Sequence, residues 1–408
     1  MAADPAGRPL GAIGAIGVVG AGAMGAGIAQ VAARHGHPVI LADAQPAAIQ
    51  RAREEHRKAV ARDVDKGRLT TADGDAMLAR LTYVDRVDQD ALTPLAACEV
   101  VIEAIIEQLP VKQSLFRTLE AVVAPGAILA TNTSSLSIAA IAGACRHRDR
   151  VLGIHFFNPA PVMPLVELIP AITTAPDVTS RARALVSGWG KVTVTAADTP
   201  GFLVNRVARP FYGESLRMLE DGIADEATID WAMTTIGGFR MGPFTLMDFI
   251  GHDVNFAVTR SVFDGMFQDP RYRPSIRQQR LVEAGWLGRK TGRGFYDYAD
   301  GAPRPVAQED PALGQRLVDR IVAMLVNEAV DAVHLRLASP EDVELAMTTG
   351  VNYPRGLLAW GDAMGPATVL AQLQVLQMET GDPRYRPSLR LRQAVQGGWS
   401  LLEGPPNA

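Results

Sequence analysis

Short apolar runs alternate with helical patterns through the first half of the chain. Residues 16–19 and 39–41 are apolar runs of strand length, and the apolar positions between them recur at helical spacing up to Gly36. Such alternation is typical of a mainly parallel sheet with helices on its faces. The same pattern continues with predicted strands at or within 95–106, 127–130, 151–154, 165–169 and 191–195, and with predicted helices at 47–67 and 110–122.

Helical periodicity dominates the second half of the chain. The turn at 197–201, Ala-Asp-Thr-Pro-Gly, ends the strand–helix pattern and indicates a domain boundary. Predicted helices follow at 202–221 and 225–236, with Asp225 as the N-cap of the second. The sequence therefore predicts an α/β domain followed by mostly α-helical structure.

The helical region contains an internal repeat. LVNRV at 203–207 matches LVDRI at 317–321, and DPRYRPS at 269–275 recurs at 382–388. AMTT also occurs twice, so three matches share an offset of 113 or 114 residues. A nearly constant offset predicts two tandem copies of one helical unit. Asp319 of the second copy stands where the first copy has Asn205, so we do not expect the copies to be functionally equivalent.

Composition and charge exclude several classes of protein. The 408 residues carry a formal net charge of −4 without blocks of like charge, which argues against a nucleic-acid surface or a polybasic membrane anchor. Residues 10–33 lack charge, but their many glycines favour a buried strand and loop over a membrane span. Cys98 and Cys145 lack metal-like spacing, so we expect no metal site, no disulfide framework and a cytoplasmic location.

A glycine motif within 16–43 gives the first functional prediction. Gly20, Gly22 and Gly25 have the spacing G-x-G-x-x-G between a predicted strand and a predicted helix, and Asp43 ends the next strand. Such a loop lets a pyrophosphate approach the backbone at the helix N-terminus, and the acid accepts hydrogen bonds from a ribose diol. The alternative is a glycine-rich turn in another α/β protein. Because a carboxylate repels a 2′-phosphate, Asp43 favours NAD over NADP.

A second group of polar residues follows the later strands. Residues 131–135, Thr-Asn-Thr-Ser-Ser, follow a predicted strand, and His155 ends another. Glu167 lies within an apolar run, where a carboxylate is costly without a partner. A His–Glu pair would satisfy that need and hold the imidazole in one tautomer. A core histidine at a strand end is the equal alternative.

Several longer motifs resemble the 3-hydroxyacyl-CoA dehydrogenase family, including the 3-hydroxybutyryl-CoA dehydrogenases, over nearly the whole chain. They are GAGAMGAGIAQ at 20–30, NTSSLSI at 132–138, GIHFFNPAPVMPLVEL at 153–168, DTPGFLVNR at 198–206, MGPFTLMD at 241–248 and GRKTGRGFYDY at 288–298. The resemblance implies a Rossmann-like NAD domain and a helical domain. We accordingly predict a disordered tail at 1–11, an NAD-binding Rossmann-like domain at 12–197, a helical domain at 198–300 and a second, truncated helical copy at 301–408.

The resemblance also implies roles for single residues. His155 matches the family's catalytic acid/base and Glu167 its partner, while Ser134 and Asn205 match residues that bind the substrate's reacting oxygen. Lys66 lies near the helix that contacts CoA in the family. The residues that match family NAD contacts are Gly20, Gly22, Ala23, Met24, Gly25, Asp43, Glu107, Lys112, Asn132, Ser134 and Lys290.

The expected activity is NAD-dependent oxidation of (S)-3-hydroxyacyl-CoA to 3-oxoacyl-CoA, or the reverse reduction. A dicarboxylic (hydroxyadipyl-type) thioester or a sugar acid is an alternative substrate. A non-catalytic NAD-binding protein is the remaining alternative, which the presence of Ser134, His155, Glu167 and Asn205 disfavours. The expected partner is an acyl-CoA, in a homodimer or in a monomer whose two helical copies form an internal pseudo-dimer.

Overall fold

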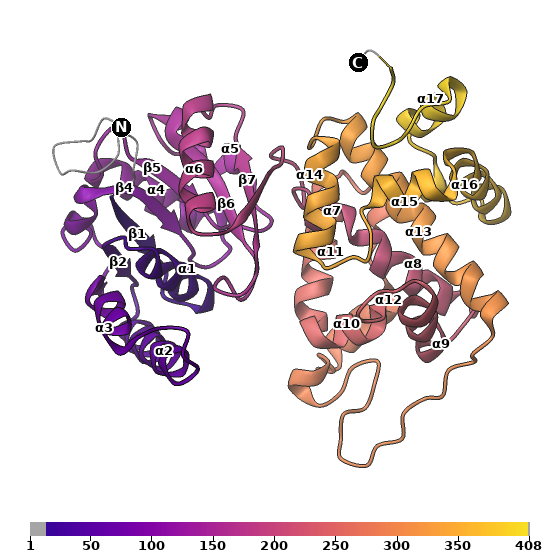
Figure 1. Ribbon diagram of the computed structural model, residues 1–408, viewed down its shortest axis with the longest axis horizontal. Coiled ribbons are helices and arrows are strands. Elements are labelled where there is room, and N and C mark those ends of the chain that lie inside the picture. Colours follow the sequence, from indigo (N-terminus) through magenta and orange to yellow (C-terminus); the bar gives the residue numbers. More distant parts are fainter. Residues whose placement is uncertain (1–13, 407–408) are drawn as a thin grey trace. The chain divides into compact units, whose positions relative to one another are not determined.

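The computed structural model describes residues 14–406, and the predicted tail at 1–11 lies outside the described residues. The chain divides after Asp198 into two compact units, Met1–Asp198 and Thr199–Ala408. Figure 1 shows strands and helices in the first unit and helices in the second. This arrangement confirms the predicted α/β Rossmann-like domain and the mostly helical region after it.

One sheet forms the centre of the first unit. Within residues 14–198 its eight strands lie in the order β3-β2-β1-β4-β5-β6-β7-β8. Neighbouring strands run parallel, except that β7 is antiparallel to β6. The strands β1 to β8 span Ala15–Val19, Val39–Ala42, Leu81–Val84, Cys98–Glu103, Ile128–Thr131, Val151–Phe156, Leu165–Pro170 and Val192–Thr195. The helices α1 to α6 span Ala23–Arg34, Pro46–Asp65, Thr71–Ala79, Leu109–Val122, Ile138–Ala142 and Pro176–Gly188.

The first helix packs on this sheet through an almost wholly apolar face. Ile28 and Ala32 of α1 are fully buried in one core with Val18 of β1 and Leu41 of β2. Burial of this kind removes apolar surface from water, at about 25 cal/mol for each Å². The packing fixes the N-terminus of α1 at the carboxyl end of β1, where dinucleotides bind in sheets of this type.

The second unit consists mainly of helices that surround a long central one. Helix α13 has 24 residues, and 15 of them are buried. A five-residue π-helical turn, Ala232–Ile236, follows α9, and a similar turn, Ala346–Gly350, follows α14, so both repeats share this irregularity. Asp225 caps α9 as predicted, because its side chain accepts a hydrogen bond from the Thr228 backbone N–H. The helices α7 to α17 span Val204–Val207, Arg209–Glu220, Glu226–Trp231, Pro243–Ile250, His252–Gly265, Ile276–Glu283, Pro311–His334, Pro340–Leu345, Leu357–Met364, Pro366–Thr380 and Leu389–Gly397.

Two buried glutamates link the repeats in a reciprocal manner. Glu328 accepts hydrogen bonds from Arg206 Nε at 2.8 Å and from Tyr272 Oη at 2.5 Å. Glu214 of the first repeat accepts one from Arg320 Nε of the second repeat at 3.0 Å. Glu328 and Arg320 stand 114 residues after Glu214 and Arg206, so each repeat gives the other the same pair. This reciprocity is the pattern of a two-fold symmetric dimer interface within one chain.

No helix among residues 14–406 is long and apolar enough to cross a membrane.

We predict that Glu328→Ala strongly destabilises the helical unit. Burial favours the neutral acid, but the charges of Arg206 and Arg271 outweigh this effect and lower the pKa of Glu328. Removal of the carboxylate takes the nearest acid from buried Arg206 and leaves Asp331, 3.8 Å away, as its remaining acidic partner. We expect a loss of about 3–5 kcal/mol in unfolding free energy, measured by denaturant titration. A lowered folded-state pKa stabilises the fold above the unfolded-state pKa, and this contribution is lost as the pH falls.

The difference in unfolding free energy between Glu328→Ala and the wild type should therefore become smaller as the pH falls. Glu379→Ala removes an exposed carboxylate and is the matched control, expected to change the unfolding free energy little. If both variants unfold like the wild type at neutral pH, the ionic link between the repeats does not stabilise the fold.

Candidate active site

The glycine loop between β1 and α1 has the shape that a pyrophosphate requires. A Cβ atom at Gly20 would lie 2.4 Å from the Ala104 carbonyl oxygen, and one at Gly25 would lie 1.7 Å from the Gly20 carbonyl oxygen. A Cβ at Gly22, in contrast, would meet no atom within 4 Å. The first and third glycines thus permit close backbone packing, and the second faces open space beside the N-terminus of α1. The loop therefore fits a dinucleotide phosphate.

Asp43 lies across this loop at the end of β2. Its Oδ2 accepts a hydrogen bond from the Ala21 N–H at 2.6 Å, and its Oδ1 accepts one from the Gln45 N–H at 2.8 Å. These two bonds fix the carboxylate at the rim of a cavity of about 620 Å³ that also borders Gly22. The position suits an acceptor for the ribose hydroxyl groups of NAD.

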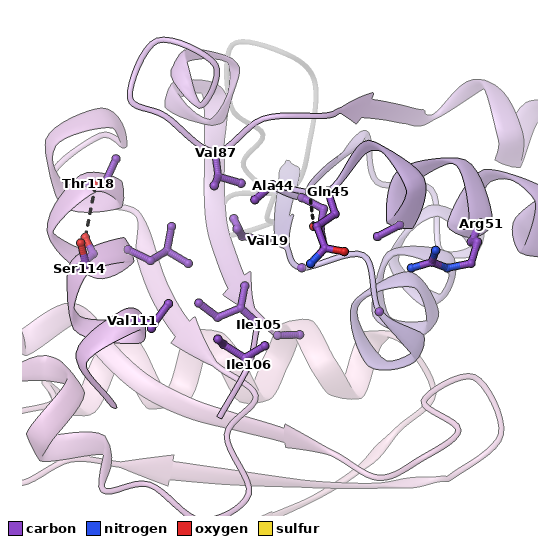
Figure 2. A pocket seen from close by; sticks show the side chains of 16 residues that line it. Val19, Ala44, Gln45, Arg51, Val87, Ile105, Ile106, Val111, Ser114 and Thr118 are labelled. Atoms are coloured by element: carbon purple, nitrogen blue, oxygen red, sulfur yellow. Dashed lines mark hydrogen bonds between the residues drawn. The ribbon is translucent and has the colours of Figure 1, made fainter. Parts of the chain in front are cut away.

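Polar side chains lie at two sides of the cavity, and apolar ones lie between them. In Figure 2, Gln45 and Arg51 lie on one side, while Val111 and Thr118 lie on the other. Ile105 lies between them, next to the carboxyl end of β4. A mostly apolar space beside a fixed carboxylate fits the adenosine half of NAD.

A buried ionic network lies at the end of β4. Lys112 is 1% exposed, and its Nζ lies 2.5 Å from Glu103 Oε1 and 3.2 Å from Glu107 Oε2. Burial favours neutral Glu107, but the Lys112 charge and the hydroxyl groups of Thr133 and Ser135 outweigh this effect and lower its pKa. Glu107 is therefore held as a carboxylate. Lys112, predicted as an NAD contact, is enclosed by these two acids.

Glu107 in turn shapes the loop after β5. Its Oε1 accepts hydrogen bonds from the backbone N–H groups of Ser134 and Ser135, at 3.1 and 3.2 Å. Asn132, the first residue after β5, accepts one through Oδ1 from the Phe156 N–H at 2.8 Å. The network thus connects the loop at 132–135 to the end of β6, where His155 lies.

His155 and Glu167 meet across the one antiparallel pair of the described sheet. The register pairs His155 of β6 directly with Glu167 of β7. Nδ1 of the imidazole lies 2.7 Å from Oε2 of the carboxylate, with His155 5% exposed and Glu167 fully buried. A carboxylate can only accept, so Nδ1 carries the proton and Nε2 is the nitrogen that can exchange a proton with a substrate. Of the two interpretations of His155, the structure supports the pair.

The remaining predicted site residues lie elsewhere in the chain. Asn205 belongs to α7 and Lys290 to the second unit, where the Lys290 Nζ lies 2.7 Å from Asp253 Oδ2. Lys66 follows the last residue of α2 and is exposed. The first unit thus brings together His155 and Glu167, with the loop at 132–135 bonded to the neighbouring strand. The roles of Asn205, Lys290 and Lys66 stay predictions.

Sequence reasoning missed Glu103. This residue ends β4, is fully buried, and accepts hydrogen bonds from the Lys112 ammonium, the Thr131 hydroxyl at 2.7 Å and the Ile105 N–H at 2.7 Å. A carboxylate next to an apolar run was the signal that indicated a partner for Glu167, and the same signal was present here.

Comparisons with known proteins agree with this geometry. The model of the 3-hydroxyacyl-CoA dehydrogenase NAD-binding domain matches residues 15–199, and the model of the family's C-terminal domain matches residues 201–298 and 317–400. The chain belongs to the 3-hydroxyacyl-CoA dehydrogenase family. The prediction of an NAD-dependent dehydrogenase of 3-hydroxyacyl-CoA is thereby confirmed, with NAD as its cofactor. The double match of the C-terminal model agrees with the repeat seen in the sequence.

Relatives with and without the second repeat are found. A 3-hydroxyadipyl-CoA dehydrogenase of Escherichia coli K12 is 39% identical, over 91% of this chain and 95% of that protein. A crystal structure titled 3-hydroxybutyryl-CoA dehydrogenase, from E. coli K12, is 38% identical with a TM-score of 0.89 and covers 94% of this chain and 98% of its own. A probable 3-hydroxybutyryl-CoA dehydrogenase of Bacillus subtilis is 38% identical over 68% of this chain and 94% of that protein.

We predict that Asp43→Asn weakens NADH binding. The substitution keeps the size of the side chain but removes the charge that accepts the ribose hydroxyl groups. Loss of a charge-assisted hydrogen bond should raise the Kd by about 10-fold or more in a fluorescence titration. The ratio of the Kd for NADPH to that for NADH should fall. Asp85→Asn, at an exposed carboxylate just after β3, is the control. An unchanged ratio in Asp43→Asn would contradict this role.

Proposed function

We propose that His155 is the general acid/base of the dehydrogenase and that Glu167 is its positioning partner. The observation that supports this proposal is the 2.7 Å contact between Nδ1 and Oε2 across paired strands. A buried carboxylate beside Nδ1 stabilises the imidazolium that forms when Nε2 takes up a proton. It also keeps the ring in the tautomer that leaves Nε2 able to act.

In the oxidative direction, the proton of the substrate's 3-hydroxyl group passes to Nε2 of His155. Bound NAD supplies the acceptor for the hydride that leaves C3. In the reductive direction, the imidazolium returns its proton to the oxygen on C3. Ser134 and Asn205 donate hydrogen bonds to this oxygen as negative charge develops on it. The Glu107 carboxylate holds the backbone of Ser134 in place through a 3.1 Å bond.

The variants His155→Ala and Glu167→Gln test these roles. A positioned general acid/base contributes roughly 10²–10⁴-fold, so His155→Ala should lose at least that much in kcat. Glu167→Gln should also lower kcat and alter its pH profile, since the amide cannot stabilise the imidazolium by charge. The rate of NADH oxidation by a 3-oxoacyl-CoA, measured over a range of pH, gives kcat and its pH profile for each variant.

The control for these variants is His147→Ala, which removes an exposed histidine in the same unit. Bound NADH, followed by fluorescence, reports whether each variant keeps its nucleotide domain folded. Nearly intact kcat in either His155→Ala or Glu167→Gln, with NADH bound normally, would show that the assigned roles are wrong.

The acyl group has two candidates. A short-chain substrate such as 3-hydroxybutyryl-CoA is our primary proposal, supported by the names of several relatives. A dicarboxylic substrate is the second, supported by the name of the E. coli relative that spans nearly the whole chain. Sugar acids are disfavoured, because the family motifs extend through both helical repeats.

We also propose that the CoA arm lies on α2 near Lys66. This helix carries several basic residues on its exposed face, and Lys66 lies at its C-terminal end. The phosphates of CoA are strongly anionic and would be attracted to such a surface.

Lys66→Glu should raise the KM for the CoA thioester several-fold, with little change in the Kd for NADH. Steady-state kinetics at two salt concentrations measure the effect, because an exposed charge pair is screened by salt. Arg86→Glu, with an exposed cation after β3, is the control for net charge. An unchanged KM in Lys66→Glu would contradict the proposed CoA surface.

The assembly state and the location of the protein are further proposals. The reciprocal Glu214 and Glu328 links support a monomer in which the second repeat takes the place of a partner subunit. Cys98 and Cys145 are both free and buried, which is compatible with a reducing cytoplasm.

A further inference from the structure

Arg209 is a buried cation without an acidic partner among the described residues. It is the first residue of α8 and only 6% exposed. Its Nε donates to the Asn205 carbonyl oxygen at 2.6 Å, and its Nη1 donates to Thr259 Oγ1 at 3.1 Å. No carboxylate of residues 14–406 lies within ion-pair distance of its guanidinium. Burial lowers the pKa of Arg209, opposed only in part by nearby Tyr212 and Tyr353. A buried charge of this kind is expensive unless something pairs with it.

The third nitrogen of Arg209 is available for a ligand. Nη2 donates to no group in the described part of the chain, and the side chain borders a cavity of about 10 Å³. This volume accommodates about one water or one carboxylate oxygen, not an acyl chain. Nearby, the Tyr353 hydroxyl is buried and makes no hydrogen bond to any described group. Arg209 Nη2 and the Tyr353 hydroxyl are thus two donors of the first repeat and its surroundings without an acceptor among the described residues, and the hydroxyl is fully buried.

The repeat shows that the fold itself does not need this arginine. The arginines that join the two repeats, Arg206 and Arg320, occur in both copies at a spacing of 114 residues. At the same spacing, Arg209 corresponds to Ala323 and Thr259 to Leu373. Both of these second-copy residues are apolar and fully buried. The two equivalent positions thus hold apolar residues in the second copy, and a hydrogen-bonded arginine and threonine in the first.

Arg209 occurs in the copy that also carries Asn205. Asn205 lies in α7 and Arg209 begins α8 four positions later, and the bond from Arg209 Nε to the Asn205 carbonyl oxygen joins the two residues. In a six-carbon dicarboxylic acyl group, three C–C bonds separate C3 from the distal carboxyl carbon, a span of about 4 Å. A guanidinium bonded to the backbone of the residue assigned to the oxygen on C3 therefore lies near enough for a carboxylate at that distance.

We propose that Arg209 binds the distal carboxylate of a dicarboxylic 3-hydroxyacyl-CoA. This proposal rests on the proposed function, since it uses Asn205 as the contact for the oxygen on C3. Of the two acyl groups proposed above, it favours the dicarboxylic one over the short-chain one. The Asn205 carbonyl oxygen and Thr259 hold the guanidinium through Nε and Nη1, and Nη2 donates to the carboxylate. The charge of the ligand compensates the buried cation, so a substrate that lacks the carboxylate leaves this cation unpaired.

The test compares two thioesters of equal chain length, 3-oxoadipyl-CoA and 3-oxohexanoyl-CoA, with NADH. The wild type should show a kcat/KM for 3-oxoadipyl-CoA at least about 10-fold above that for 3-oxohexanoyl-CoA. In the double variant Arg209→Ala with Thr259→Leu, this ratio should fall by about 10–100-fold, mainly through KM. The double variant copies the pair Ala323 and Leu373, so the fold is expected to accept it.

Two further variants make the result specific. Arg209→Lys keeps a positive charge and should retain part of the preference for 3-oxoadipyl-CoA. Arg277→Met removes an arginine of the same unit that is paired with Glu226 at 2.7 Å and does not line this cavity, and the ratio should stay at the wild-type value. Thermal unfolding of each variant checks that the helical unit is folded.

A wild-type ratio near one, or a ratio that survives the double variant, would overturn the carboxylate site while turnover itself still supports the proposed function. If acetoacetyl-CoA and both six-carbon thioesters all fail to oxidise bound NADH, the proposed function is wrong. The proposed carboxylate site, which depends on that function, is then wrong as well.

Discussion

The antiparallel pairing of β7 with β6 is the constraint on which the proposed chemistry depends. His155 and Glu167 are twelve residues apart, and they become cross-strand neighbours because the chain reverses between the two strands. Directly opposed residues have Cβ atoms about 5 Å apart, which suits a hydrogen bond between an imidazole and a carboxylate. A slip of one residue would move the Glu167 side chain to the other face of the sheet and leave a buried carboxylate without its histidine.

The same rule, that a buried charge needs a partner, organises the rest of the molecule. At the end of β4 it joins Lys112 to Glu103 and Glu107, which fixes the loop that follows β5. In the helical unit it joins the repeats through Glu214 and Glu328. Among the buried cations of the described residues, two depart from the rule. Lys191 Nζ donates to two backbone carbonyl oxygens, those of Ala160 and Met163, whereas Arg209 keeps one nitrogen for the carboxylate of the proposed ligand.

Much of the fold could be predicted from sequence, as could the glycine loop beside Asp43, because these features depend on local pattern. The G-x-G-x-x-G spacing, the apolar runs and Asp43 each report on neighbours along the chain. The position of Glu103 beside an apolar run indicates that its carboxylate needs a partner, but only the fold shows that the partner is the buried Lys112 of α4. Spacing alone also left His155 undecided between a core residue and a catalytic one, since the pair depends on strand direction and register, which are long-range properties. Arg209 had no sequence signal, because its lack of an acidic partner is visible only in three dimensions.

The most direct test of the whole account is the oxidation of NADH by acetoacetyl-CoA with the wild-type protein, run beside NADPH and beside a sugar acid with NAD. The account predicts rapid turnover of the thioester with NADH and much slower turnover with NADPH, because Asp43 borders the nucleotide cavity. Turnover of the sugar acid without turnover of any thioester would contradict it, as would a preference for NADPH.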